Sequence, residues 1–159
     1  MQRIAERLYL ASCEDAEAVT QGPFAVVMIC EWPCRIFSER LGRPLRTLVS
    51  QGRETLVAGK PYFHLDLPNL EIPNYRVCDF VETLERIKRW QESHEVVILS
   101  EHAESRGASL GMLWLAFRAR TISRSSFRAA RMDFQNLYPR YAPWPGLVIF
   151  LEQEWDAFA

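Results

Sequence analysis

The chain has 159 residues, of which 48% are hydrophobic and 25% are charged; these proportions suit an ordinary globular domain and exclude a disordered or fibrous protein. The formal net charge of −1 argues against a general binder of nucleic acid or of an anionic membrane. The N-terminus lacks an apolar signal core, no apolar run could span a bilayer, and the four cysteines are typical of reduced thiols. We therefore expect one cytoplasmic domain over residues 1–159, with no membrane or nucleic-acid partner.

The N-terminal third predicts short strands and one short helix. Residues 7–12 form a first strand that ends in a cap-like serine, and residues 15–19 form a short helix. The run over residues 24–30 is apolar and rich in β-branched residues, which suits a strand buried on both faces. Residues 31–60 contain Pro and Gly breaks and little periodicity, so we expect an irregular insertion with at most one short helix.

The middle of the chain predicts the centre of the domain. Residues 62–65 are a strand candidate, and the prolines of residues 66–74 indicate a loop. Asn74 is expected to cap a long helix that reaches Gln91, because apolar residues recur there at helical spacing. Residues 95–99 give the strongest signal for a buried strand in the chain.

The C-terminal half predicts mainly helices. A helix is expected over residues 107–119, then a third helix, capped by Ser123 or Ser125, through Leu137, and a last helix over residues 147–158. Strands thus alternate with helices early, and helices gather late. This order predicts an α/β domain with a mostly parallel central sheet, helices on both sides and a C-terminal helical layer.

The junction after the strand at 95–99 is the best candidate for a binding site, since parallel sheets bind ligands where a strand meets a helix N-terminus. Residues 96–109 read Val-Val-Ile-Leu-Ser-Glu-His-Ala-Glu-Ser-Arg-Gly-Ala-Ser. This segment resembles the signature loop of the dual-specificity and tyrosine phosphatases. In that family a strand is followed by His-Cys, five residues including a Gly, and Arg followed by Ser or Thr. Residues 8–12, 62–66 and 136–139 also resemble family segments in the expected order.

The resemblance implies a phosphate-binding loop over Ser100, Glu101, His102, Ala103, Glu104, Ser105 and Arg106. In the family the Cys thiolate attacks phosphorus, the loop amides and the Arg hold the phosphate, and an upstream Asp protonates the leaving oxygen. No metal or cofactor is implied. Phosphate, sulfate or a phosphorylated protein is the expected ligand.

Four departures from the family pattern weigh against catalysis. Ser100 replaces the nucleophilic Cys, Leu99 the preceding His, Ala103 the loop Gly and Gly107 the Ser or Thr after the Arg. A serine hydroxyl needs an adjacent general base, and we expect His102 to point away from Ser100. Ala103 is expected to strain or to move the loop, because glycine there permits a positive φ.

Two carboxylates and the general acid also bear on the site. Glu104 is expected to repel an anion, whereas the family tolerates Glu at position 101. Asp66 is a candidate general acid, and Asn69 lies where the acid is more readily placed, although an amide donates no useful proton.

Other motifs are interpreted as structural. Residues 34–40 also spell Cys, five residues and Arg, but the bulky Ile36 and Phe37 make a phosphate loop there implausible. Cys30 and Cys34 are read as structural thiols, not as a redox or metal pair. Of the 19 basic residues, 17 are Arg. Five of them are interpreted as a solvated face in preference to a docking face: Arg118, Arg120, Arg124, Arg128 and Arg131. Trp144 is expected near the surface.

The sequence therefore predicts a phosphatase-fold pseudoenzyme. Alternatives are an active hydrolase that uses Ser100 or a relocated nucleophile, an engineered Cys-to-Ser trapping variant, and an interaction module with no anion site. The sequence leaves the physiological partner and the oligomeric state open.

Overall fold

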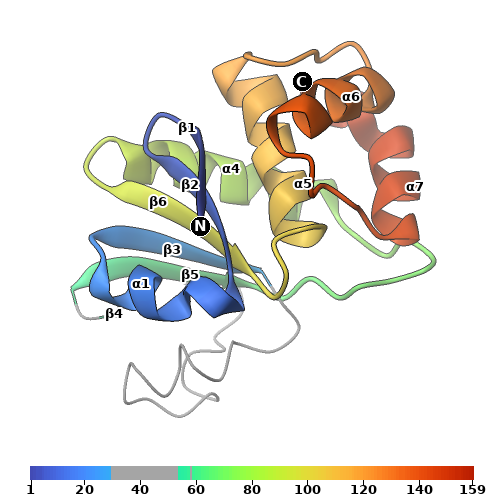
Figure 1. The fold of residues 1–159 in the computed structure, drawn as a ribbon. Coiled ribbons are helices and arrows are strands. Elements are labelled where there is room, and N and C mark those ends of the chain that lie inside the picture. Colours follow the sequence, from blue (N-terminus) through green and yellow to red (C-terminus); the bar gives the residue numbers. More distant parts are fainter. Residues whose placement is uncertain (30–53, 58) are drawn as a thin grey trace.

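The computed structural model describes residues 1–29, 54–57 and 59–159. These residues form a mixed, mostly parallel sheet of six strands in the order β1-β2-β6-β3-β5-β4 (Figure 1). The strands are β1 (Gln2–Ala5), β2 (Leu8–Ser12), β3 (Phe24–Ile29), β4 (Thr55–Val57), β5 (Lys60–Leu65) and β6 (Glu95–Ser100).

The four central strands are parallel, and β6 lies between β2 and β3. All six residues of β3 are buried, as expected of a strand with both faces covered. The register pairs Ser100 with Ser12 on one side and with Ile29 on the other. Three strands therefore end together at the carboxyl edge, where β6 enters the candidate loop.

Helices cover both faces of the sheet, as the sequence predicts (Figure 1). On one face lie a 3₁₀ turn, η1 (Cys13–Asp15), and α1 (Ala16–Gln21), which pack against a smaller core that includes Met28, Val97 and Leu99. On the other lie α4 (Val77–Gln91), α5 (Arg106–Leu113), η2 (Trp114–Ala119), α6 (Phe127–Leu137), α7 (Pro145–Glu154) and η3 (Trp155–Phe158). This larger layer holds the main core and its aromatic cluster.

The expected helices are present, with corrected ends. Helix α4 begins after Arg76, not after Asn74, and the Arg76 guanidinium bonds Asp79 in the first turn. The cap of α6 is Ser126, whose hydroxyl accepts from the Ala129 amide at 3.1 Å, and not Ser123 or Ser125. Arg76 reaches a side chain of the first turn of α4, and Ser126 reaches a free amide of the first turn of α6. The residues predicted as caps lie too far upstream to make such contacts.

Two edge strands were not predicted. Strand β1 is mostly exposed, so it lacks the apolar pattern by which strands are recognised. Residues 55–57 and Lys60 fall in the expected irregular insertion but form β4 and the start of β5. The Cys30–Cys34 pair and the Cys-to-Arg motif at residues 34–40 lie outside the described residues.

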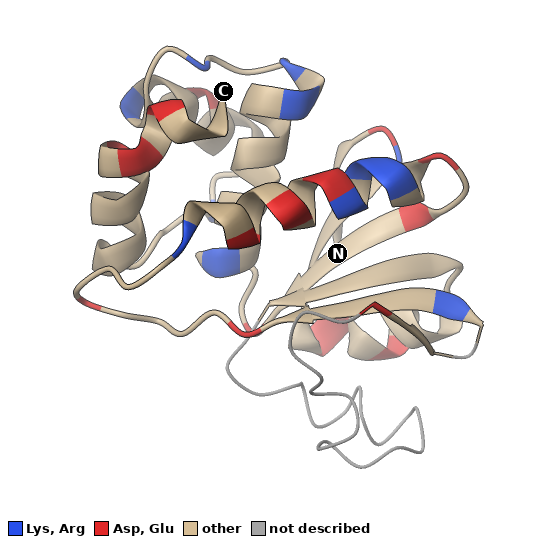
Figure 2. Cartoon of the chain, turned by 180° about the vertical axis from the view of Figure 1, so that it is seen from behind, with Lys and Arg blue, Asp and Glu red and all other residues tan. Residues whose placement is uncertain are grey.

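Charges of both signs are spread over the helical layer (Figure 2). Helix α4 carries Asp79 in its first turn and Lys88 and Arg89 in its last, an arrangement that complements the helix dipole. Arg118 pairs with Glu85 of α4 at 2.8 Å, so this member of the arginine group serves intramolecular structure. None of the helices in the described part of the chain is long and apolar enough to cross a membrane.

Glu54 fastens the edge of the sheet to α4. Its carboxylate accepts from the Trp90 indole at 3.0 Å, from Arg89 at 2.6 Å and from Arg86 at 3.3 Å. Burial by itself raises the pKa of Glu54, but these hydrogen bonds and the arginine charges outweigh burial and lower the pKa below the ordinary value of a glutamate.

We predict that Glu54→Gln lowers the free energy of unfolding at pH 7 by about 0.5–1 kcal/mol, a modest amount because the carboxylate is partly exposed. The pKa of Glu54 is lower in the folded protein than in the unfolded chain, so the ionised carboxylate stabilises the fold at pH values above the unfolded-state pKa. This stability is lost as the pH falls through the folded-state pKa. Urea unfolding at several pH values should therefore show the difference between the two proteins vanishing at acidic pH. A difference that persists unchanged at acidic pH would refute this role.

Candidate functional site

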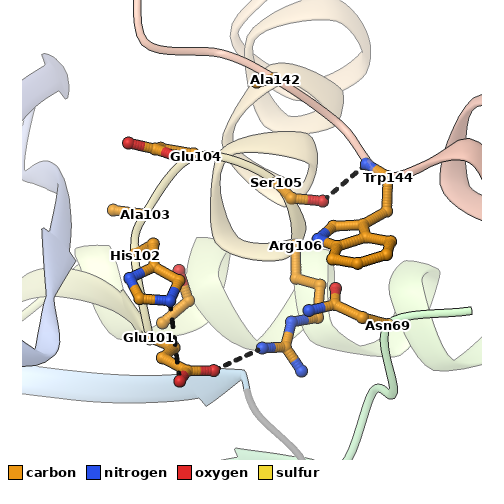
Figure 3. Close-up of a pocket in the computed structure, with 10 residues that line it drawn as sticks. Asn69, Glu101, His102, Ala103, Glu104, Ser105, Arg106, Ala142 and Trp144 are labelled. Carbon is orange, nitrogen blue, oxygen red and sulfur yellow. Dashed lines mark hydrogen bonds and ion pairs between the residues drawn. The ribbon is translucent and has the colours of Figure 1, made fainter.

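Residues 100–106 form the loop between β6 and α5 at the carboxyl edge of the sheet. They line a pocket of about 60 Å³ together with Asn69, Ala142 and Trp144 (Figure 3). A cavity of this size has room for water or for a small anion. The structure thus brings every residue of the predicted loop around one pocket.

The carbonyl groups of this loop are bonded outward by four residues from two segments, Cys13 and residues 138–142. The Glu101 carbonyl accepts from the Cys13 amide at 3.2 Å, and the Glu104 carbonyl accepts from the Ala142 amide at 2.8 Å. The Ala103 carbonyl accepts from the Tyr138 hydroxyl at 2.8 Å. The Arg140 guanidinium lies 3.4 Å from the His102 carbonyl.

Outward carbonyls orient the peptide amides in the opposite sense. Within the described residues, the amides of 102–105 donate to no protein acceptor. Ala103 has φ +56°, the left-handed conformation that glycine adopts most easily. The loop therefore keeps its curled shape and bears the strain expected of Ala103. Inward amides in such a curl form an anion-binding concavity.

Arg106 is buried below the pocket, with 5% of its surface exposed. One terminal nitrogen donates to the Leu67 carbonyl at 2.8 Å, and the other lies 3.4 Å from the Glu101 carboxylate. A buried cation needs such partners, because burial without them is costly. The carboxylate that stands against anion binding is therefore that of Glu101, whereas the sequence analysis expects it to be that of Glu104.

Glu104 turns outward and pairs with Arg140 at 3.1 Å, and Figure 3 shows its carboxylate pointing away from Arg106. The carboxylate that the sequence analysis expects to repel an anion is thus paired with an arginine and directed away from Arg106. Burial raises the pKa of Tyr138, with Arg140 opposing and Glu104 adding to the shift. The phenol consequently stays protonated and can donate to the Ala103 carbonyl.

Ser100 lies at the floor of the loop with 3% of its surface exposed, and its hydroxyl has no hydrogen-bond partner among the described residues. His102 is directed outward, 74% exposed, and lies 3.6 Å from the Glu101 carboxylate. It is not hydrogen-bonded to Ser100, in agreement with the sequence analysis. A Cβ atom at position 107 would lie 2.5 Å from the Ser100 hydroxyl oxygen. Glycine at this position therefore leaves room for the Ser100 side chain.

The loop after β5 contributes Asn69 to the pocket. The Asn69 side-chain oxygen is buried and has no partner within the described residues. Asp66, the other candidate for the general-acid position, directly follows β5 and is not among the residues that line the pocket. The structure thus places an amide where the pocket meets this loop.

An extended segment and the first two residues of α7 hold these loops together, and the sequence analysis did not assign them a role. Its alternate amides donate outward: Ala142 to the Glu104 carbonyl, Trp144 to the Ser105 hydroxyl at 3.0 Å, and Gly146 to the Leu70 carbonyl at 2.9 Å. We call residues 142–146 the strap. Alternating donation is what an extended backbone provides, and the Pro-Trp-Pro-Gly run was the only sequence signal for it.

The site contains no cluster of metal ligands. Over residues 1–29, 54–57 and 59–159, no group of three or more His, Cys, Asp or Glu side chains is arranged to hold a metal ion. The polar groups around the pocket are amides, the Arg106 guanidinium, the hydroxyls of Ser100 and Ser105, the His102 imidazole and the carboxylates of Glu101 and Glu104.

We predict that Gly146→Ala destabilises the protein by about 1–3 kcal/mol, because a methyl group there would press on the Leu70 backbone. Gly107→Ala is the matched control, since its methyl group would meet the Ser100 hydroxyl, which can rotate. It should cost less than about 1 kcal/mol. Urea unfolding of both variants measures the contrast, and equal losses would contradict the role of the strap.

No protein-family model matches the sequence, and no curated protein matches it. Solved structures do. Human DUSP28 has a TM-score of 0.64 and 17% identity, covering 99% of this chain and 96% of its own. DUSP15 has a TM-score of 0.66 and 13% identity, with coverages of 98% and 86%. The human tyrosine phosphatase-like serine/threonine/tyrosine-interacting protein has a TM-score of 0.67 and 20% identity, with coverages of 99% and 95%. The chain therefore has the fold of the dual-specificity phosphatases.

Proposed function

We propose that this protein is a pseudophosphatase: it binds phosphate or a phosphorylated partner through residues 100–106 and lacks thiol-dependent phosphatase activity. One observation carries the proposal. Four consecutive loop carbonyls, those of residues 101–104, are bonded outward around a buried Arg106, while Ser100 occupies the position of the family's nucleophile.

Three features support anion binding. The amides of 102–105 have no acceptor among the residues that the structure describes. The free amides and dipole of the α5 N-terminus attract negative charge, and Arg106 supplies a positive charge at the pocket. Charge-assisted hydrogen bonds from a guanidinium to an oxyanion are among the stronger contacts in proteins. Together they favour a small anion with several oxygen acceptors, such as phosphate.

Glu101 opposes this affinity. Its carboxylate already occupies the Arg106 nitrogen nearest to it, so an anion must share or displace that contact. We expect phosphate to bind with a dissociation constant on the order of millimolar, which corresponds to about −4 kcal/mol.

The same geometry disfavours catalysis. A serine hydroxyl becomes a nucleophile only beside a general base, and the Ser100 hydroxyl has no partner among the described residues. Asn69 in the pocket donates no useful proton to a leaving group. A trapping variant of an active enzyme would differ at one position, whereas Leu99, Ala103 and Gly107 also depart from the family pattern.

We further infer a cytoplasmic protein with no nucleic-acid partner. Cys78 carries an exposed thiol that belongs to no disulfide among the described residues, which supports a reducing compartment. Acidic and basic residues mixed along the helical layer (Figure 2) support the absence of a surface built for a polyanion.

We predict that the purified protein hydrolyses p-nitrophenyl phosphate no faster than Ser100→Ala, because Ser100 has no base. Ser100→Cys should recover little activity, since Leu99 and Gly107 still lack the groups that tune the family's thiolate. Release of p-nitrophenol in a continuous assay measures both. Clear turnover by the unaltered protein that Ser100→Ala abolishes would establish the serine hydrolase instead.

We also predict that Glu101→Gln tightens phosphate binding about fivefold to tenfold, because it removes a negative charge beside the anion. Shifts of the amides of residues 101–106 during a phosphate titration, followed by NMR, give the dissociation constants. Glu104→Gln is the matched control: its carboxylate pairs with Arg140 outside the pocket, so the affinity should stay the same.

Arg106→Lys keeps the positive charge but loses the fork of donors, so it should weaken binding, with folding checked by thermal unfolding. If the NMR shifts of the loop amides do not change up to tens of millimolar phosphate in either the unaltered protein or Glu101→Gln, the pocket is not an anion site. The interaction module then becomes the better description.

A further inference from the structure

An open groove of about 740 Å³ lies between the edge strand β1 and the helical layer. Its walls come from β1 and the turn that follows it, from η2, and from the C-terminal half of α6. Strand β1 is the outermost strand at this end of the sheet (Figure 1). The apolar residues that line the groove are Ile4, Ala5, Leu115, Ala119, Ile122 and Leu137. The groove shares no residue with the pocket at residues 100–106, so it is a separate surface.

The rim of the groove leaves apolar surface in water. Leu137, the last residue of α6, is 43% exposed, and Ala5 and Ile122 are only partly buried at the margin of the main core. Towards the interior the apolar surface continues to the buried Ile4 and Leu115. Connected apolar surface of this kind marks an interaction site, whereas single exposed apolar residues do not.

The backbone beside the groove adopts uncommon conformations. The segment η2 is wound as a π-helix, and the Thr121 amide donates to the Leu115 carbonyl at 3.0 Å. Arg120, which ends η2, has φ +55°, a left-handed conformation that is costly for a residue with a Cβ atom. Turns of π-helix are rare and occur frequently at functional sites, and backbone strain gathers at such sites too. Leu115 and Ala119 bring this segment into the wall of the groove.

Strand β1 is poorly suited to accept a further strand at its free edge. It has four residues, and its pairing register with β2 shifts between Arg3 and Ala5. The Arg3 side chain donates to the Ala5 carbonyl of the same strand at 3.1 Å. Short length, an irregular register and a charged side chain are the features by which proteins protect sheet edges. An apolar groove beside a protected edge suits the apolar face of a helix better than an added strand.

The polar rim of the groove is acidic. Glu6 lies in the turn after β1 and Asp133 lies on α6, and both are exposed. One oxygen of Asp133 accepts from the Ser123 amide at 2.8 Å. In the described part of the chain neither carboxylate pairs with a cation, and no basic residue lines the groove. This charge complements lysine or arginine side chains that flank an apolar stripe.

We propose that the groove docks an amphipathic helix of a partner protein. The apolar face of that helix carries leucine or isoleucine at i, i+3, i+4 and i+7, and its margins carry lysine or arginine. The apolar stripe packs on Ile122 and Leu137, and the cations meet Glu6 and Asp133. The proposal goes beyond the anion site and does not depend on it, because the two surfaces have no residue in common.

The test uses three synthetic peptides of equal length. The first is a helix with a leucine stripe flanked by lysine, the second has glutamate in place of every lysine, and the third alternates valine and lysine to favour a strand. NMR shifts of the amides of residues 4–6, 115–122 and 133–137 give the dissociation constants. The leucine–lysine helix should shift these amides and bind about tenfold more tightly than the leucine–glutamate helix.

Two variants have matched controls. Glu6→Lys and Leu137→Ser should each weaken binding of the leucine–lysine helix about fivefold, because one reverses a rim charge and the other removes apolar surface. Glu152→Lys makes the same charge change on α7, and Met132→Ser removes a residue of α6 that is 62% exposed. Neither control residue lines the groove, so both should leave the dissociation constant within about twofold.

Four results would each overturn the proposal. They are no shift of the groove amides with the leucine–lysine helix, equal binding of the two helices, tighter binding of the valine–lysine strand, and shifts of the same amides when the protein alone is concentrated. The third result assigns the edge to an added strand, and the fourth assigns the groove to a second copy of this chain. Arg106→Lys should leave peptide binding unchanged, so the docking groove and the anion site stand or fall separately.

Discussion

The buried guanidinium of Arg106 is the group around which the site is organised. A cation with 5% of its surface exposed must be neutralised and hydrogen-bonded. Its partners are the Leu67 carbonyl from the loop after β5 and the Glu101 carboxylate from the candidate loop itself. One side chain at the start of α5 thereby fixes two loops against each other. The requirement is structural first, and the proposed anion site is a consequence of it.

Glu101 meets that structural need with the same kind of group that an anionic ligand presents. Under the proposed function, stability and binding are therefore coupled in this pocket, since an incoming anion would compete with the Glu101 carboxylate for Arg106. In a positively charged pocket without such a carboxylate, a bound anion would meet no competition of this kind. It also shows why a shared fold does not decide function, because function depends on the groups placed on that fold.

Support for the loop comes from outside it. Cys13, Tyr138, Arg140 and Ala142 together turn its carbonyls outward, so the inward amides are a product of tertiary structure. Burial raises the pKa of Tyr138 and of Tyr141, and both phenols remain protonated at neutral pH. Tyr141 shares a buried hydrogen bond with Ser109 of α5, which secures the same helix from below. The strap then completes the pocket with the indole of Trp144.

The sequence by itself determined the central strands, the helix after the loop, the loop's boundaries and the place of Arg106. These follow from local signals: apolar β-branched runs, helical periodicity and a short motif. Tertiary structure alone decided the edge strands β1 and β4, the pairing of Glu104 with Arg140, the closure of Glu101 on Arg106, and the entry of Asn69 and Trp144 into the pocket. Most of these depend on contacts between residues far apart in the chain, such as Leu67 with Arg106 and Glu104 with Arg140. Such contacts leave no periodic trace in the sequence, because their energy arises only once the sheet has brought the segments together.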